Sequence, residues 1–193
     1  MPKGIVLTQQ SVPADAAVPT IAPLASPLCA GAGAVVNYRS VEDRADYAQL
    51  QYCDAMNLAV ARDLAAPSVA GVARYCCVEV QDSGASSEIA PILMIVAFCV
   101  PAARAEEVER WYVQEHAPLL LRAPGWLRMR RYQALSCSGR AWTSLALHEL
   151  RSLAVLDTPE RAFARSTPWR AQLEREAWFG QAGRFVYERI SSV

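Results

Sequence analysis

The chain has 193 residues, of which 53% are hydrophobic and 20% are charged, and its 19 basic residues are balanced by 19 acidic ones. This length is enough for one compact domain or two small ones, and the composition is that of a soluble globular protein. A net charge of zero argues against partners held mainly by charge, so we expect neither nucleic acid nor a membrane surface as the partner.

The beginning of the chain carries no predicted targeting or membrane segment. The apolar run after Lys3 ends at Thr8, which is too short for a signal peptide. The apolar stretch 18–36 is broken by three prolines, which exclude a continuous spanning helix. No C-x-x-C spacing occurs among the six cysteines, and most of them lie in apolar runs. We therefore expect reduced thiols in a cytoplasmic protein.

Apolar runs and alternation predict strands, and longer periodic stretches predict helices. In the first half of the chain the predicted order is strand, broken helix, strand, strand, helix and strand, over residues 4–12, 14–30, 33–41, 47–54, 56–66 and 72–80. A polar, turn-rich linker follows at 81–91. The second half repeats the order with an unbroken first helix, over residues 92–100, 103–122, 126–134, 142–150, 159–179 and 184–190.

The two halves also share a sequence landmark. "LQYCDAMNLAV" at 50–60 is matched by "LALHELRSLAV" at 145–155, an offset of 95 residues. Each half has the β-α-β-β-α-β order of a ferredoxin-like unit. We therefore predict an α+β fold of two ferredoxin-like repeats, residues 1–80 and 92–193, packed sheet to sheet as an α+β barrel within one chain.

Strand alternation predicts which side chains share a face. In 126–134, Leu127 and Met129 are expected to face the helices, and in 142–150 Leu145 and Leu147. The opposite face would then be polar and aromatic, which is unusual for a core and typical of a cavity wall. The residues predicted on this face are Trp126, Arg128, Arg130, Tyr132, Ser144, Ala146 and His148.

The predicted helix 103–122 carries the most distinctive motif. Trp111 and Glu115 share one helix face, as do Tyr112 and His116, at a spacing of four residues. Pro118 disfavours helical geometry at the residue before it, so we expect the helix to bend or restart just after His116. An imidazole takes or gives a proton near neutral pH, although His116 has a plainer alternative as a cap or a donor to a backbone carbonyl.

The stretch "WYVQEHAPLLLRAPGWLRMRRY" and the later "RFVYERI" resemble the dimeric α+β barrel superfamily, most closely its EthD-like members. Their pattern is W-Y-x-x-E-H-x-P, then P-G, then an Arg-Arg-Tyr strand. The match covers 92–190, whereas the first half matches only in the order of its elements. Its counterpart segment lacks the Trp-Tyr and Glu-His pairs, so we predict a degenerate first repeat and one equipped pocket per chain.

The resemblance implies two ferredoxin-like units forming a barrel and a small organic substrate handled without a cofactor. Relatives include cyclases, dehydratases, isomerases, decarboxylases and monooxygenases, and some other branches bind haem. We expect no metal site, because the two histidines share no H-x-x-x-H spacing with another ligand, but one axial histidine would suffice for haem. Nucleotide-binding and serine-hydrolase motifs are absent from the sequence.

The predicted catalytic residues are His116, as general acid or base, with Arg130, Tyr132 and His148 stabilising the anion. The predicted substrate-binding residues are Trp111, Tyr112, Glu115, Trp126 and Arg128. Each has a structural alternative: the aromatic residues as core, the arginines in ion pairs with Glu and Asp at the rim, Glu115 as a surface carboxylate, and His148 as a satisfied buried histidine.

The sequence thus predicts a cofactor-independent enzyme of cyclase, dehydratase or isomerase type, acting on an aromatic or polyketide-like molecule. Two alternatives stay open: a cofactor-free monooxygenase of the same fold, and a non-catalytic protein that binds or carries a small molecule. The chain is expected to act as a monomer, in which the repeats form a pseudo-dimer, or as a homodimer.

Overall fold

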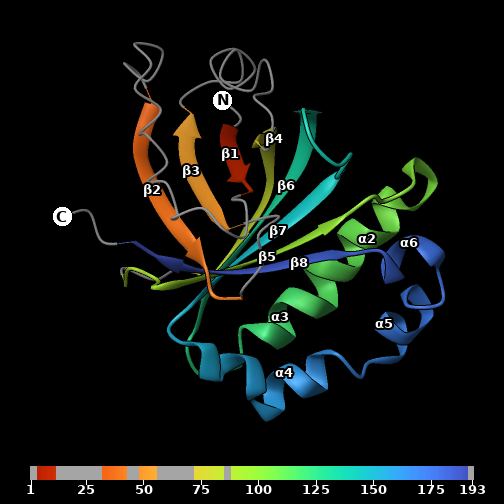
Figure 1. Ribbon diagram of the computed structural model, residues 1–193. Coiled ribbons are helices and arrows are strands. Elements are labelled where there is room, and N and C mark those ends of the chain that lie inside the picture. The colour runs from red at the N-terminus through yellow and green to blue at the C-terminus, as the bar shows by residue number, and fades with distance from the viewer. Residues whose placement is uncertain (1–3, 12–31, 43–47, 56–71, 85–87, 191–193) are drawn as a thin grey trace. The chain divides into compact units, whose positions relative to one another are not determined.

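The computed structural model describes residues 4–11, 32–42, 48–55, 72–84 and 88–190, in a mixed α+β fold (Figure 1). The chain divides into two compact units whose segments alternate along the sequence. The first unit comprises residues 1–79, 132–141 and 185–193, and the second comprises 80–131 and 142–184. The predicted helices 14–30 and 56–66 lie outside the described residues. The division into repeats 1–80 and 92–193, and their packing as a barrel, stay predictions.

The first unit is an antiparallel sheet. Its central strand β1 (Gly4–Gln10) pairs with β3 (Gln49–Ala55) on one side and with β4 (Val72–Ser83) on the other. β2 (Ala32–Ser40) pairs with β3 and, at its end, with β8 (Gly183–Arg189). These strands confirm the predicted runs to within three residues at each end, because each run carries the apolar and β-branched side chains that a pleated, half-buried surface favours.

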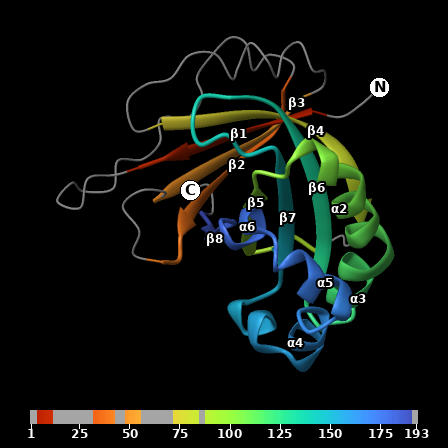
Figure 2. The ribbon, with the colours of Figure 1, turned by 90° about the vertical axis from the view of Figure 1, so that its right-hand side faces the viewer.

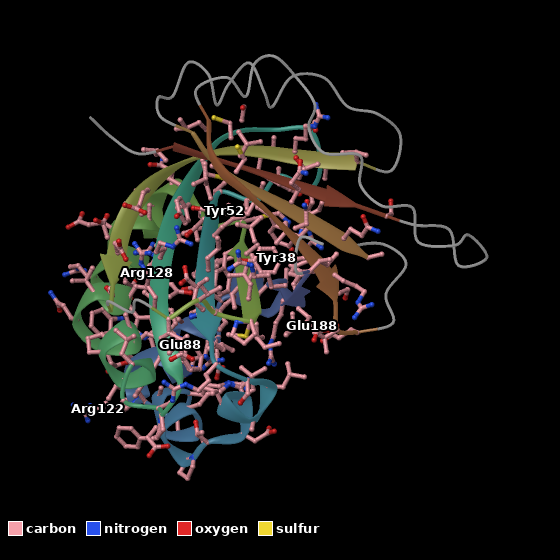
Figure 3. All side chains as sticks on the ribbon, turned by 90° about the vertical axis from the view of Figure 1, so that its left-hand side faces the viewer. Tyr38, Tyr52, Glu88, Arg122, Arg128 and Glu188 are labelled. Atoms are coloured by element: carbon pink, nitrogen blue, oxygen red, sulfur yellow. The ribbon has the colours of Figure 1, made fainter. Side chains whose placement is uncertain are left out.

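Buried polar side chains lie within this sheet and are bonded to one another. Gln9 Nε2 donates to the Tyr187 hydroxyl at 3.0 Å, and Gln51 Nε2 donates to Asn37 Oδ1 at 3.0 Å. Tyr38 and Tyr52, from β2 and β3, are buried as well (Figure 3). The core of this unit is therefore partly polar.

The sheet of the second unit has β7 (Ser144–Leu150) between β5 (Ile92–Phe98) and β6 (Trp126–Cys137). β5 and β7 are antiparallel, with Met94 opposite His148 and Val96 opposite Ala146. Directly opposed residues point to the same face of a sheet, so the register places His148 beside the apolar side chains of β5.

One layer of short helices packs on this sheet, and Figure 2 shows α2 (Ala105–Trp111) and α3 (Ala117–Leu120) running alongside β6 and β7. The 3₁₀ turn η3 (Ala102–Arg104) precedes α2, and the π-helical turn η4 (Tyr112–His116) joins it to α3. Helical backbone thus extends over most of the predicted helix 103–122. Its buried side chains form a core with the strands, made of Phe98, Val100, Val108, Trp111, Tyr112, Ala117, Met129, Ala146, Leu173 and Phe179.

The prediction of one helix over 159–179 was wrong. The structure has three short helices there, α4 (Pro159–Ala164), α5 (Pro168–Leu173) and α6 (Ala177–Gly180), preceded by the 3₁₀ turn η5 (Leu153–Asp157). Pro168 forces extended backbone at Thr167, whose hydroxyl then caps α5 by accepting from the Arg170 N–H. α4 begins in the same way, with Thr158 as the cap and Pro159 as the first helical residue. Among the described helices, none is long and apolar enough to cross a membrane.

Candidate functional site

A cavity of about 410 Å³ lies within the second unit. This volume falls within the roughly 300–1,000 Å³ typical of small-molecule sites. The wall consists of large apolar and aromatic side chains, two imidazoles, four guanidinium groups and one carboxylate. The lining residues are Met94, Val96, Phe98, Trp111, Tyr112, His116, Leu120, Trp126, His148, Arg161, Arg165, Arg170, Glu174, Phe179, Gly180, Ala182 and Arg184.

The π-helical turn η4 places the motif of the sequence in this wall. The π-helical turn ends at His116 and α3 begins at Ala117, the point at which we expected the helix to bend or restart. The backbone angles stay helical there, and the Ala117 N–H bonds the Tyr112 carbonyl five residues back. Pro118 has no N–H to continue the normal ladder, and the wider turn accommodates this. A turn of this width lets residues five apart meet, and the Trp111 and His116 rings stack at 4.2 Å between centroids.

The predicted face-sharing within the motif is confirmed. The Tyr112 ring meets the His116 ring edge to face at 5.4 Å, and Trp111 Nε1 donates to Glu115 Oε1 at 3.2 Å. Glu115 does not line the cavity; it also accepts from the Thr167 hydroxyl at 2.7 Å. Its carboxylate therefore ties the π-helical turn to the cap of α5, which supports the site from outside.

His148 reaches the same cavity from the sheet, although not from the face we predicted. We expected Leu145 and Leu147 of β7 to face the helices, but Ala146 belongs to the core shared with the helices. His148, two residues on, follows it to that side. Its ring meets the Trp126 indole edge to face at 5.2 Å.

Trp126 is positioned by the Pro-Gly turn that precedes β6. Gly125 has a φ of +89°, a left-handed conformation that side chains disfavour, and a Cβ there would lie 2.9 Å from Val155. The Trp126 N–H bonds the Ala123 carbonyl, and the Gly125 carbonyl accepts from the Arg151 N–H. The glycine therefore fixes the point at which the indole enters the cavity.

Three predicted site residues on β6 lie outside the cavity wall. Arg130 pairs with Glu149 at 2.6 Å, Arg128 pairs with Asp82, and the Tyr132 hydroxyl lies 3.4 Å from Glu79 Oε2. The predicted register of β6 holds at Met129, which packs with the helices. It does not hold at Trp126, which we placed on the far face with Arg128 and Arg130 and which instead lines the cavity. The cavity, however, lies on the helix-covered face, so alternation carries these three residues to the opposite face.

Both histidines are held neutral. Burial, with repulsion from Arg170 and Arg165, lowers the pKa of His116 to about 3, although a hydrogen bond to the Ala164 backbone opposes the shift. Burial, with repulsion from His116, Arg184 and Arg161, lowers the pKa of His148 to about 3. Within the described residues, neither Nδ1 atom has a hydrogen-bond partner. At neutral pH the cavity therefore holds two neutral imidazoles, each with one N–H and one lone pair.

The four cavity cations, Arg161, Arg165, Arg170 and Arg184, were not predicted. Arg170 pairs with Glu174 at 2.7 Å and lies over the Phe179 ring. Burial and repulsion from Arg184 and Arg165 lower the pKa of Arg161 to about 10, so it stays charged at neutral pH. A sequence signal did exist: Arg161 and Arg165 are four residues apart and therefore share a helix face. The spacing of Arg161 and Arg165 did not indicate, however, that a cavity lies beside this helix face.

The donor set is unsuited to a resident metal, since no group of three His, Cys, Asp or Glu side chains converges anywhere in the described part of the chain. A haem would need one of the two imidazoles as its axial ligand. The cavity of about 410 Å³ has the size of a small-molecule site, and its aromatic lining suits an organic substrate.

Comparisons with known proteins show the fold. No protein-family model matches the chain, and no curated protein matches its sequence. An anthrone oxidase-like protein of known structure is similar with a TM-score of 0.67 at 10% identity, over 98% of this chain and 92% of that one. A monooxygenase-like protein from Listeria innocua gives 0.61 at 12% identity, over 100% and 96% of the two chains.

A third structure has a TM-score of 0.58 at 9% identity, over 100% of this chain and 97% of that one. It is described as a ferredoxin fold protein related to antibiotic biosynthesis monooxygenases, from Listeria monocytogenes. At such low identities the likeness shows the fold alone. The chain thus shares a ferredoxin-like α+β fold with proteins of nearly its own length.

Proposed function

We propose that this protein is a cofactor-independent oxygenase that removes a proton from a small aromatic substrate and lets the resulting anion react with dissolved oxygen. The observation that carries the proposal is the pairing of two neutral, buried imidazoles with four guanidinium groups in one aromatic-lined cavity. The names of two structural neighbours, an anthrone oxidase-like and a monooxygenase-like protein, support the same class of reaction.

The first step is proton removal by His116. The hydrogen bond between the His116 ring and the Ala164 backbone raises the pKa of His116. A hydrogen bond has this effect when the ring N–H donates to a backbone carbonyl. The proton then sits on the nitrogen that donates, and Nδ1 is left with its lone pair. Such a buried imidazole takes a proton only when an anion forms beside it, because the anion offsets the cost of the buried charge. A C–H next to a carbonyl, or a phenol, supplies that anion.

The second step uses the guanidinium groups and oxygen. Fixed cations that are partly shielded from water, as Arg161 and Arg170 are, stabilise an enolate or phenolate more strongly than water does. The electron-rich anion transfers electrons to O₂, a C–O bond forms, and loss of water from the hydroperoxide leaves a carbonyl. For a methylene carbon flanked by two rings, CH₂ plus O₂ gives C=O plus H₂O, so the substrate is oxidised and one oxygen atom ends in water.

The finer assignments rest on the sequence. The W-Y-x-x-E-H-x-P motif, which resembles EthD-like members, supplies Trp111, Tyr112 and His116 to the cavity wall. The same base would also serve a cyclase, dehydratase or isomerase that uses no oxygen. A carrier protein would bind the ligand and form no product. These three readings differ in oxygen uptake and in product, which makes them separable in one assay.

The test is oxygen uptake by the purified protein with 1,8-dihydroxyanthrone, with the quinone product followed by its absorbance. We expect one O₂ consumed per quinone formed, and no Soret band in the spectrum of the protein itself. His116→Ala should lower turnover by about a hundredfold or more, because it removes the general base. Arg175→Gln, an exposed arginine outside the cavity, is the matched control and should leave turnover unchanged.

Several results would contradict the proposal. Turnover that survives in His116→Ala would exclude this residue as the base, provided that circular dichroism shows a native fold. Conversion of the anthrone without oxygen uptake would favour a non-oxidative enzyme. Binding without any product would favour a carrier.

A further inference from the structure

The cavity carries more positive charge than the proposed reaction requires. Its lining has four guanidinium groups and one carboxylate, a surplus of three positive charges in a chain whose net charge is zero. Both histidines are neutral and add nothing to this surplus. A single enolate or phenolate oxygen is one negative charge, so it would leave most of the surplus unbalanced.

Neighbouring groups balance part of the charge on three of these cations, Arg161, Arg165 and Arg170. Glu174 bonds Arg170 through both Nε and Nη2. An Nη of Arg161 donates to the backbone carbonyl of Leu156. Its guanidinium is also attracted to Asp157, but burial and repulsion from Arg184 and Arg165 outweigh this attraction and lower its pKa. The Arg165 side chain makes no hydrogen bond or ion pair with the described residues. Attraction to Glu174 acts on Arg165, but burial and repulsion from Arg170 and Arg184 outweigh it and lower the pKa of Arg165.

These cations come from separate elements and meet at one place. Arg161 lies on α4, Arg165 follows it directly, Arg170 lies on α5 and Arg184 begins β8. Like charges brought together in a partly buried site repel one another and destabilise the empty protein. An arrangement of this kind is typical of a site whose negative partner arrives with the ligand, because planar guanidinium groups bind oxyanions through paired hydrogen bonds.

We infer that the substrate carries a permanent anionic group, a carboxylate or a tetrahedral oxyanion, attached to its aromatic body. The cavity cations hold this group, while the rings lie against Trp111, Trp126 and Phe98 and the reactive carbon faces the imidazoles. The inference rests on the proposed function only in identifying the ligand as the substrate. It names the chemical class of that substrate, which turnover of a neutral anthrone would not reveal.

The test is calorimetric binding of three probes that share one ring system. Anthraquinone-2-carboxylate is planar and anionic, anthraquinone-2-sulfonate is tetrahedral and anionic, and anthraquinone-2-carboxamide is neutral. We expect at least one anion to bind about tenfold or more tighter than the amide, since hydrogen bonds to charged groups contribute about 1.5–3 kcal/mol. The tighter of the two anions identifies the kind of oxyanion.

The arginine variants assign the effect to the cavity. Arg165→Gln should weaken binding of the preferred anion about tenfold and leave binding of the amide unchanged. It removes no side-chain hydrogen bond or ion pair within the described residues, so it should fold, and Arg161→Gln provides a second variant. The matched control Arg175→Gln should bind all three probes like the parent protein. Binding of the anion should also raise Tm more than binding of the amide, because only the anion relieves the repulsion.

Three outcomes overturn the inference: equal affinity for the anions and the amide, equal weakening of anion and amide by Arg165→Gln, or no binding of any probe. None of these outcomes depends on turnover. A protein that oxidises anthrone but does not distinguish anion from amide would keep the proposed function and lose this inference. A protein that binds the anion selectively but consumes no oxygen would do the reverse.

Discussion

Two groups of arginines in the second unit illustrate how charge is used differently on the two faces of one sheet. The strand cations, Arg128 and Arg130 on β6, each meet a carboxylate, Asp82 and Glu149 respectively. Of the cavity cations on the opposite, helix-covered face, Arg170 pairs with Glu174, and Arg165 makes no ion pair with the described residues. Charge balance therefore distinguishes cations that serve the fold from cations available to a ligand.

The difference corrects an inference from sequence alternation. We predicted a functional role for the strand that contains Arg128, Arg130 and Tyr132 because these polar side chains share a face. In the structure, Arg128 and Arg130 are each paired with a carboxylate. The alternative reading, ion pairs with Glu and Asp, describes Arg128 and Arg130 correctly. The comparison leads to three predictions about stability, which are expected to differ in size between the two faces.

The largest effect is expected on the strand face. In Arg130→Met, the loss of the guanidinium leaves Glu149 mostly buried and unpaired, which should lower the free energy of unfolding by about 3 kcal/mol. The double variant Arg130→Met, Glu149→Leu should recover most of this loss, as measured by urea unfolding. Probe affinity at the cavity should not change in either variant. A drop in affinity with no loss of stability would reverse the assignment of the two faces.

The histidines of the cavity make stability depend on pH. The pKa of His148 is about 3 in the folded protein and about 6.5 in an unfolded chain. Between these values the unfolded state binds the proton, so stability rises with pH across this window and is lost as pH falls. One such group contributes a slope of about 1.4 kcal/mol per pH unit.

His148→Gln should remove that contribution, so that urea unfolding between pH 4 and 6 shows a shallower slope than in the parent protein. The Arg175→Gln control should keep the full slope. Equal slopes in parent and His148→Gln would mean that His148 is protonated in the folded state, and the cavity would then lack its second neutral imidazole.

The smallest effects should have opposite signs on the two faces. Arg128→Gln breaks a partly exposed ion pair and should cost at most about 1 kcal/mol. Arg165→Gln relieves repulsion and should change stability by less than about 0.5 kcal/mol, in the stabilising direction. Thermal unfolding at low and high salt measures both, because salt screens exposed charges and should shrink each difference. A clear loss of stability in Arg165→Gln would show that the cavity cations are structural.

Much of the fold was predictable from local pattern. The strands were located because alternation and β-branched runs are properties of short segments. The prediction of a continuous helix over 159–179 was wrong because the apolar periodicity runs through Thr167 and Pro168, where the helix is broken. The effect of Pro168 on the residue before it is local, so this break could have been read from the sequence. The faces of β7 were wrong for a different reason: leucines suit either face of a sheet that is covered on both sides, and only packing decides between them.

The site was predictable in part. His116, Trp111 and Tyr112 were identified by a motif. Trp126 and His148 were identified by strand alternation, which placed them on the face opposite the helices, and the structure brings all five to one cavity on the helix-covered face. The cavity cations escaped notice because they come from α4, α5 and β8, which are separated in sequence and meet only in the folded chain. The π-helical turn was also hidden, since its hydrogen bonds depend on packing as well as on Pro118.

The measurement that tests the central claim most directly is a ¹H–¹⁵N NMR titration of the indole signals with anthraquinone-2-carboxylate. Trp111 and Trp126 line the cavity on the helix-covered face, and Trp142 does not. The account predicts that the Trp111 and Trp126 indole resonances shift together, saturate at one equivalent, and leave Trp142 in place. A shift of Trp142 alone, with Trp111 and Trp126 unmoved, would place the ligand elsewhere and contradict the account.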